Sequence, residues 1–155
     1  MNLDFDLDEQ SRFNARCAAI IYNADKAKVL LFQPRGCDYY MLPGGRIEFG
    51  EDSAAAIKRE IKEETGFELD FEFIGIQENF LIRHGKNLMQ YAFNFEAQYD
   101  GPEESFICKD NNTQIFFWIP LKDVENLNLV PTSNKKLILS ENRIIHSIER
   151  ARTVY

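Results

Sequence analysis

The sequence has little of what marks secreted, membrane-spanning or nucleic-acid-binding proteins. Its three cysteines, Cys17, Cys37 and Cys108, are an odd number without metal-type pairing, so we expect reduced thiols in a cytoplasmic protein. No apolar run approaches the roughly 18 residues that a membrane span requires, and the acidic residues 1–10 lead us to expect no signal or transit peptide. The net charge of −7 opposes binding to a nucleic acid polymer.

The composition, in contrast, is that of a folded core. Hydrophobic residues make up 45% of the chain, with 13 Phe and 6 Tyr. A chain of 155 residues is most simply one domain, which buries roughly 70% of its unfolded surface. No repeat or linker divides the chain. We therefore expect a flexible N-terminal arm over residues 1–11 and a single domain over residues 12–155.

Short apolar runs separated by polar turns predict a β-rich framework. The first two runs are apolar throughout and flank a polar turn, which favours a hairpin buried on both faces. Later runs alternate between apolar and polar residues, most clearly at 90–99, as in half-buried strands. The runs predict strands at residues 16–24, 28–33, 39–42, 69–73, 90–99 and 114–119.

One segment, residues 53–65, is predicted to be a helix because it is rich in alanine and contains neither proline nor glycine. Asp52 or Ser53 can cap its first turn, and Gly66 can end it.

The last third of the chain is less regular. Residues 121–127 predict a short helical turn, and residues 131–133 resemble the start of a C-terminal helix. Residues 143–150 fit either a continuation of that helix or a last strand.

Three glutamates share one face of the predicted helix. At 100° per residue, a core-facing arc holds Ala54, Ile57, Ile61 and Thr65. An adjacent arc holds Glu60, Glu63 and Glu64. Carboxylates at these spacings repel one another, so a purely structural helix would gain more from alternating charges. Divalent cations such as Mg²⁺ or Mn²⁺ reverse this balance because they bind several carboxylate oxygens. The alternative interpretation is a solvated acidic face.

The turn before the helix suggests a second function for its residues. Gly44 and Gly45 allow backbone torsions and a close ligand approach that a side chain would block. Glu51 lies just before the helix, where its charge favours the helix dipole. It can also reach back to Arg59 and brace the loop against the helix.

Taken together, the spacing of these residues is recognisable. The segment resembles the signature of the Nudix hydrolases, and every fixed position of that signature is filled. These positions are Gly45, Glu51, Arg59-Glu60-Ile61, Glu63-Glu64, Gly66 and Phe67. A looser resemblance extends over about residues 12–131. The resemblance implies an α/β fold, an α/β/α sandwich around a mixed β-sheet. It also implies Mg²⁺- or Mn²⁺-dependent hydrolysis of a phosphoanhydride bond in a small nucleoside diphosphate derivative, through attack by metal-activated water.

The resemblance also assigns roles to single residues. As catalytic residues it implies Glu51, Arg59, Glu60 and Glu63. As metal ligands it implies Glu60 and Glu64, with Glu63 completing the set. Substrate contacts are expected from Gly44, Gly45, Arg35 and Arg46, and Arg83 and Lys86 are further basic candidates. A homodimer would also be consistent with the resemblance.

The general base stays open at this point. It is either a glutamate of the helix or a carboxylate of a later loop, where Glu103, Glu104 and Asp110 are the candidates. Many relatives would be expected to carry a His-Glu pair near residues 89–90, but this chain has Met89-Gln90. This departure removes one potential base or ligand.

Two other functions compete with hydrolysis. A non-catalytic nucleotide-binding sensor on the same fold would be expected to lose a glutamate of the motif, and none is lost here. A structural calcium-binding domain would be expected to contain an EF-hand-like loop, which the sequence lacks. The sequence does not select the nucleotide derivative or the number of metal ions.

Overall fold

The computed structural model describes residues 1–141 and 145–154, and its strands all belong to one sheet. The strands are β1 (Asp4–Asp6), β2 (Ser11–Asn23), β3 (Lys28–Pro34), β4 (Glu72–Arg83), β5 (Lys86–Tyr99), β6 (Phe106–Ile107), β7 (Gln114–Pro120) and β8 (Ile145–Val154). The helices are α1 (Ser53–Thr65), the 3₁₀ helix η1 (Leu121–Asn126) and α2 (Asn134–Leu139).

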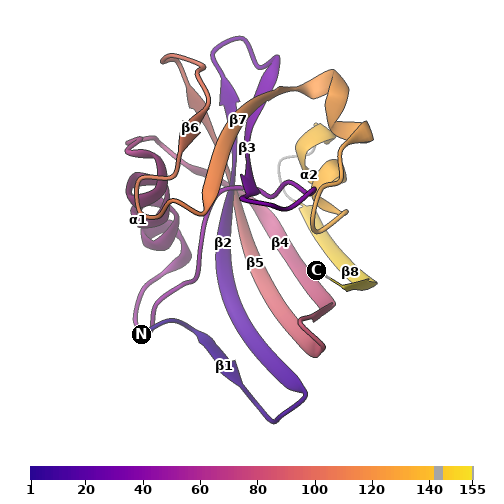
Figure 1. The fold of residues 1–155 in the computed structure, drawn as a ribbon. Helices are drawn as coiled ribbons and strands as arrows, with labels where there is room; N and C mark the ends of the chain where they lie inside the picture. Colours follow the sequence, from indigo (N-terminus) through magenta and orange to yellow (C-terminus); the bar gives the residue numbers. More distant parts are fainter. Residues whose placement is uncertain (142–144, 155) are drawn as a thin grey trace.

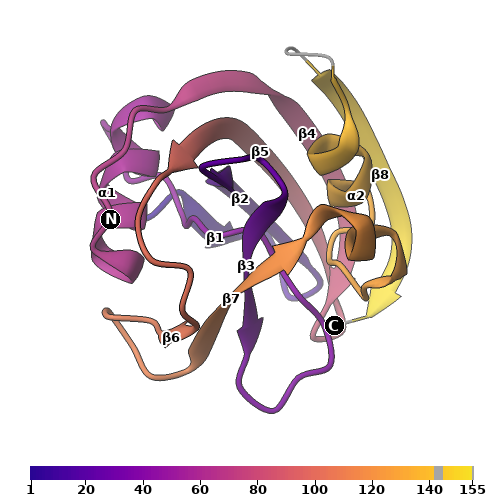
Figure 2. The same ribbon diagram turned by 90° about the horizontal axis from the view of Figure 1, so that it is seen from above.

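The sheet is mixed, and helices lie on both of its sides. Its strand order is β6-β7-β3-β2-β5-β4-β8, with β1 paired to the outer half of β2. The β2–β5 and β4–β8 pairs are parallel, and the other pairs are antiparallel. Helix α1 covers one face, while η1 and α2 lie across the other (Figures 1 and 2). This arrangement confirms the predicted α/β sandwich.

Strand β2 is covered on both faces because its side chains alternate between two cores. Cys17, Ala19 and Ile21 pack in the cluster that contains α1, whereas Ala18 and Ile20 pack in the cluster that contains α2. All five side chains are buried. The continuous apolar run that predicted a doubly covered strand therefore has the structure expected of it.

Helix α1 begins and ends where the sequence predicts. Asp52, not Ser53, is the N-cap, and its carboxylate accepts the N–H of Ala55 at 2.8 Å. Gly66 ends the helix with a φ of 78°, a left-handed conformation that glycine adopts without strain.

The rotation of α1 about its axis differs slightly from the prediction. Ala54, expected in the core, is exposed, and Ala56 is buried in its place. The buried face runs through Ile57 and Ile61 to Glu64. The helix therefore turns one of its glutamates inward, which a pattern based on apolar residues alone does not reveal.

The N-terminal segment requires a correction, because residues 4–6 form a strand where we expected a flexible arm. The carboxylate of Asp4 is only 6% exposed and forms ion pairs with both Arg12 and Arg46. Its oxygens accept two hydrogen bonds from Arg12, at 2.6 and 2.8 Å. The backbone of Leu3 also bonds to Ile47 and Ala15, at 2.8 and 2.9 Å. A buried carboxylate between two guanidinium groups holds this segment against β2.

Two predicted strands are also altered. Residues 39–42 form isolated bridges to Phe32 and Leu129 instead of a strand, since only one residue pair is bridged at each neighbour. Strand β4 begins at Glu72, so the alternating Leu69 and Phe71 precede it. These two side chains pack against the cluster that contains α1, but their backbone pairs with no strand. The alternation of apolar and polar residues at 69–73 therefore predicted which side chains pack inward and not which backbone pairs.

The C-terminal alternatives are decided in favour of a strand. Residues 145–154 pair in parallel with β4, whereas residues 142–144 lie outside the described residues. The helical turn at 121–127 and the start of a helix after residue 133 are confirmed as η1 and α2. None of the described helices has the length and apolar character that a membrane crossing needs.

The docking of the N-terminal segment can be tested with Asp4→Asn. The substitution removes the charge partner of two guanidinium groups that are each about 40% exposed. Allowing for screening by solvent, we expect the free energy of unfolding to fall by about 1–2 kcal/mol, measured by urea denaturation.

The matched control is Asp6→Asn on the same strand, which removes only the solvent-exposed pair with Lys86 and should cost less than about 1 kcal/mol. Equal effects of the two substitutions would contradict a specific role for Asp4.

Candidate active site

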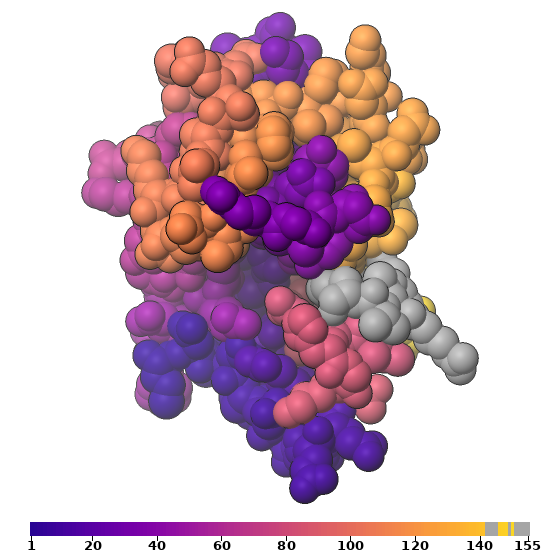
Figure 3. All heavy atoms as spheres, in the orientation of Figure 1, coloured from indigo at the N-terminus to yellow at the C-terminus, as the bar shows by residue number. Residues whose placement is uncertain are grey.

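A polar cavity of about 580 Å³ lies beside α1. It opens on the face shown in Figure 3, where the surface is hollowed beneath the purple loop that follows β3, between the indigo N-terminal segment and the pink β4–β5 hairpin. Its charged lining comes from six separate segments of the chain: Arg16, Arg35, Arg46, Glu48, Arg59, Glu60, Glu63, Glu64, Arg83 and Asp110. Eight of the site residues assigned from the sequence meet here: Gly44, Gly45, Arg35, Arg46, Arg59, Glu60, Glu63 and Glu64.

The three glutamates of α1 occupy different environments along the cavity wall. Glu64 is only 5% exposed and accepts the backbone N–H of Gly44 at 3.2 Å. Glu60 is half-buried and accepts a hydrogen bond from Arg59 at 2.8 Å. The side chain of Glu63 is 49% exposed, and its contact with Arg59 is long, at 3.4 Å. One helix face thus presents a buried, a half-buried and an open carboxylate.

Burial changes the acidity of two of these groups. It raises the pKa of Glu64 to about 8, although the N–H of Gly44 opposes the shift. It also raises the pKa of Glu60, where the charge of Arg59 opposes it. Two desolvated carboxylates side by side are costly without a cation, so this donor set suits a hard divalent ion. As they stand, the described acidic, His and Cys side chains do not form a group of three at metal-binding separation, because Arg59 and Gly44 hold the glutamates.

The two glycines shape the wall that faces these carboxylates. A Cβ atom on Gly45 would lie 2.1 Å from the carboxyl carbon of Glu60. Gly44 has a φ of 131°, and a Cβ there would lie 2.3 Å from the carbonyl oxygen of Cys17. Gly44 therefore lets the loop approach β2, while Gly45 leaves room for the carboxylate of Glu60.

Arg59 and Glu51 form the brace that was one of the two roles considered for Glu51. The Nε and Nη2 atoms of Arg59 donate to the two oxygens of Glu51, each at 2.9 Å. Glu51 also accepts the N–H of Glu48, and Arg59 donates to the carbonyl oxygen of Arg46 at 3.0 Å. Glu51 does not line the cavity. It therefore joins the loop to the helix, and the bidentate geometry makes the pair rigid.

The later loop contributes one carboxylate to the cavity. Asp110 lines it, because the N–H of Lys109 donates to the carbonyl oxygen of Glu64 at 2.8 Å and ties the loop to the end of α1. Glu103 bonds instead to Lys28 at 2.6 Å and Asn23 at 2.8 Å, outside the cavity. Glu104 is exposed and is also absent from the lining.

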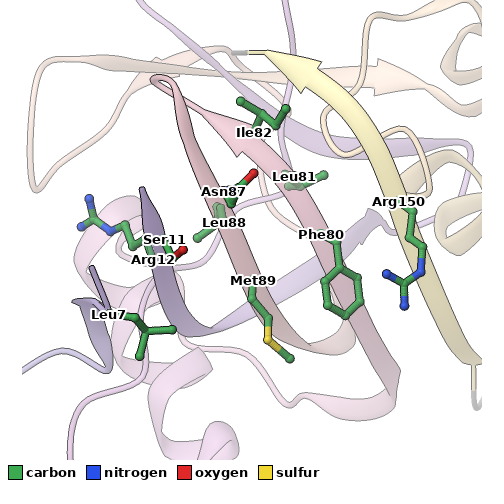
Figure 4. A pocket seen from close by; sticks show the side chains of 10 residues that line it. All are labelled: Leu7, Ser11, Arg12, Phe80, Leu81, Ile82, Asn87, Leu88, Met89 and Arg150. Atoms are coloured by element: carbon green, nitrogen blue, oxygen red, sulfur yellow. The ribbon is translucent and has the colours of Figure 1, made fainter. Parts of the chain in front are cut away.

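The departure at residues 89–90 has a structural counterpart. Gln90 lies on the cavity floor, accepts a hydrogen bond from Asn79 at 3.0 Å and donates one to Asn14 at 2.9 Å. Met89 points to the opposite side of the sheet, into a groove of about 450 Å³ whose described lining residues include no acidic side chain (Figure 4). At this position the chain has hydrogen-bonded neutral amides, those of Asn79, Gln90 and Asn14, in place of the ionisable His-Glu pair expected in relatives.

Sequence reasoning missed some of the cavity residues and misplaced another. Arg16 was not singled out, although it is the one charged residue at the start of the apolar run that became β2. Glu48 was also missed. Arg83 does line the cavity, whereas Lys86 bonds to Asp6 outside it.

Comparison with known proteins agrees with this geometry. The chain matches the family model described as the NUDIX domain over residues 12–139. It belongs to the Nudix family. A curated Nudix relative, the uncharacterized Nudix hydrolase YvcI of Bacillus subtilis, is 29% identical over 105 residues. That match covers 67% of this chain and 65% of the length of YvcI.

Solved Nudix structures have the same fold. A MutT protein from Bacillus halodurans gives a TM-score of 0.65 at 22% identity, with 86% of this chain and 89% of the other covered. The dihydroneopterin triphosphate pyrophosphohydrolase of E. coli gives 0.63 at 21% identity, covering 80% and 91%. The NUDIX domain of NrtR from Shewanella oneidensis, solved with ADP-ribose, gives 0.63 at 20%, covering 85% and 86%. Nudix proteins generally use divalent metal ions.

The buried carboxylate predicts an unusual pH dependence of stability in metal-free protein. The pKa of Glu64 is about 8 in the folded chain, above its ordinary value of 4.5, so the neutral form favours folding. The stabilisation is complete below about pH 4.5 and is lost as the pH rises through 8. Glu64→Gln, which cannot ionise, should remove this loss, so in EDTA its free energy of unfolding should exceed that of the wild type at pH 8.5 by more than at pH 5.5.

The matched control is Glu63→Gln, where the side chain is half exposed and the same change should leave the wild-type pH dependence in place. A wild type and Glu64→Gln with parallel pH profiles would show that Glu64 is not the buried acid of this site.

Proposed function

We propose that this chain is a cytoplasmic hydrolase that cleaves a phosphoanhydride bond in a small nucleoside diphosphate derivative, with Mg²⁺ or Mn²⁺ as its cofactor. The observation that carries the proposal is the set of three glutamates on one face of α1. They open onto a cavity that also holds arginines, and the Arg59–Glu51 pair positions them. Acidic groups for a cation beside basic groups for phosphate are what such a reaction needs.

Glu60 and Glu64 are the proposed metal ligands, with Glu63 completing the set. Their environments support this assignment, because Glu64 and Glu60 are desolvated carboxylates and Gly45 lets the carboxylate of Glu60 lie against the loop backbone. When bound, a divalent ion would neutralise phosphate charge and make water more acidic. Metal binding would also require Glu60 to exchange its hydrogen bond with Arg59 for the cation.

The other residues orient the substrate and accept the proton. Gly44 and Gly45 allow the phosphates to approach the backbone, and Arg35 and Arg46 line the cavity where guanidinium groups can bind phosphate oxygens. The base is one of the two carboxylates that face the cavity outside the buried pair, Glu63 on α1 or Asp110 on the later loop. Both are accessible to water.

The ligands named for similar folds belong to the same chemical class. Dihydroneopterin triphosphate and ADP-ribose both contain phosphoanhydride bonds, and each is named with a neighbour of the same fold. The competing function is a sensor that binds a nucleotide without cleaving it. The intact set of glutamates in the cavity supports hydrolysis over this alternative.

A panel of nucleotide derivatives tests the proposed function. We expect release of phosphate, pyrophosphate or nucleoside monophosphate from at least one compound with Mg²⁺ or Mn²⁺, and none in EDTA.

Glu63→Gln and Glu64→Gln should fold and lose roughly 2–4 kcal/mol of transition-state stabilisation, measured as kcat/KM. Glu72→Gln, an exposed glutamate at the start of β4, is the control. Full activity in both helix variants would contradict the metal site, and no turnover across the panel would favour the sensor.

The base can be identified by comparing Asp110→Asn with Glu63→Gln. A general base contributes about 10²–10⁴-fold to the rate, so the variant that lacks it should show a loss of that size in kcat. It should also lose the acidic limb of the pH profile of kcat. Glu103→Gln is the matched control from the same loop region, because Glu103 is held by Lys28 outside the cavity and should have near-wild-type kcat. A larger loss in Glu103→Gln than in the other two would contradict this account.

A further inference from the structure

The cavity that holds the glutamates is also lined by a group of arginines outside α1. Arg16, Arg46 and Arg83 all line it, from β2, from the loop after Gly45 and from the end of β4. The chain as a whole has a net charge of −7, so basic side chains are gathered here against the overall balance.

Two of these arginines face each other directly. Arg16 and Arg46 are partners in an isolated antiparallel bridge, which places their Cβ atoms about 5 Å apart on the same face. Like charges in that position destabilise a strand pair. Burial lowers the pKa of Arg46; the charge of Asp4 opposes this shift, and the charges of Arg12, Arg83 and Arg16 add to it. A bound anion would stabilise the facing guanidinium groups of Arg16 and Arg46.

The carboxylate of Asp4 offsets the charge of Arg46 only in part. Asp4 pairs with Arg46, but it is shared with Arg12, which lies outside the cavity. The Nε atom of Arg16 is buried and has no hydrogen-bond partner within residues 1–141 and 145–154, and its Nη2 reaches the carbonyl oxygen of Gly44 only at 3.5 Å. A buried guanidinium N–H without an acceptor is a site that a phosphate oxygen can fill.

Arg16 also lies beside both the loop at the glutamates and Arg46. Its Nη2 lies 3.5 Å from the carbonyl oxygen of Gly44, whose N–H donates to Glu64, and its bridge partner is Arg46. A chain of phosphates that starts at the glutamates can therefore reach Arg16 and, beside it, Arg46. The volume of about 580 Å³ is adequate for such a ligand.

We propose that Arg16, Arg46 and Arg83 form an anion subsite that binds a phosphate group beyond the diphosphate held at the glutamates, so that the preferred substrates carry at least three phosphate groups. The substrate preference rests on the proposed function, because it presupposes hydrolysis. The anion subsite itself can be tested without any reaction. Its recognition chemistry is bidentate hydrogen bonding between guanidinium groups and phosphate oxygens.

The test measures binding of inorganic phosphate, pyrophosphate and tripolyphosphate by isothermal titration calorimetry, in EDTA and at low ionic strength. We expect tripolyphosphate to bind most tightly and its affinity to fall as salt is added. Arg16→Gln and Arg83→Gln should each weaken tripolyphosphate binding by about tenfold or more. Arg150→Gln is the matched control, because this substitution removes the same charge at a different place. Arg150 lies over Phe80 in the groove that Met89 lines (Figure 4). Thermal unfolding of each variant verifies the fold, and Arg83→Lys should restore part of the affinity.

Two outcomes would overturn the subsite: no binding of tripolyphosphate to the wild type, or equal weakening by Arg150→Gln and by the two cavity variants. A second measurement separates this inference from the proposed function. With Mg²⁺, the ratio of kcat/KM for a nucleoside triphosphate to that for the diphosphate of the same nucleoside should fall in Arg83→Gln. If the wild type cleaves both compounds and the ratio is unchanged, the subsite is wrong while the hydrolase stands. If nothing is cleaved but calorimetry gives the expected pattern, the hydrolase is wrong while the subsite stands.

Discussion

The candidate site depends on how the loop before α1 lies along β2. Three backbone hydrogen bonds hold it there, from Cys17 to the carbonyl of Gly45, from Ala19 to that of Pro43, and from residue 47 to that of Ala15, at 2.9, 2.9 and 3.0 Å. This pairing is possible because Gly44 lacks a Cβ that would collide with β2. It brings the backbone of Gly45 against Glu60 and the N–H of Gly44 against Glu64.

The Arg59–Glu51 pair completes this constraint from the helix side. A bidentate ion pair joins the middle of α1 to Glu51, two residues before the helix, and the same guanidinium group bonds to the loop carbonyl of Arg46. The loop therefore cannot shift along β2 without moving the helix and its glutamates. The proposed metal site needs this rigidity, because carboxylates that share one site repel one another when no cation is bound.

Local patterns in the sequence predicted the part of the site that is contiguous in the chain. The spacing of Glu60, Glu63 and Glu64 on one helix, the cap at Asp52 and the glycine at 66 are all set by residues within one or two turns. The fold class followed from apolar runs and from the family resemblance. By contrast, the positions of Asp4, Arg16 and Asp110 depend on pairing between segments far apart in sequence. No local period reports such contacts, which is why the arm was expected to be free and Arg16 was overlooked.

The same reasoning explains what the structure added. Sequence reasoning offered three later carboxylates as bases, and the bond from Lys109 to the end of α1 brings only Asp110 into the cavity. The same cavity is lined by the glutamates of α1 and by Arg16, Arg46 and Arg83 from other segments. Acidic and basic side chains in one cavity of an acidic protein support the proposal that its ligands are small phosphorylated compounds.

The central claim, that α1 and its loop form a metal centre, is tested most directly by diffraction from crystals soaked in Mn²⁺. The anomalous signal of manganese locates the ion independently of any activity. The account predicts a peak in contact with the carboxylates of Glu60 and Glu64, beside Gly45, and its disappearance in Glu64→Gln crystals treated in the same way. A wild-type cavity without a peak, or a peak bound elsewhere on the chain and unaffected by that substitution, would contradict it.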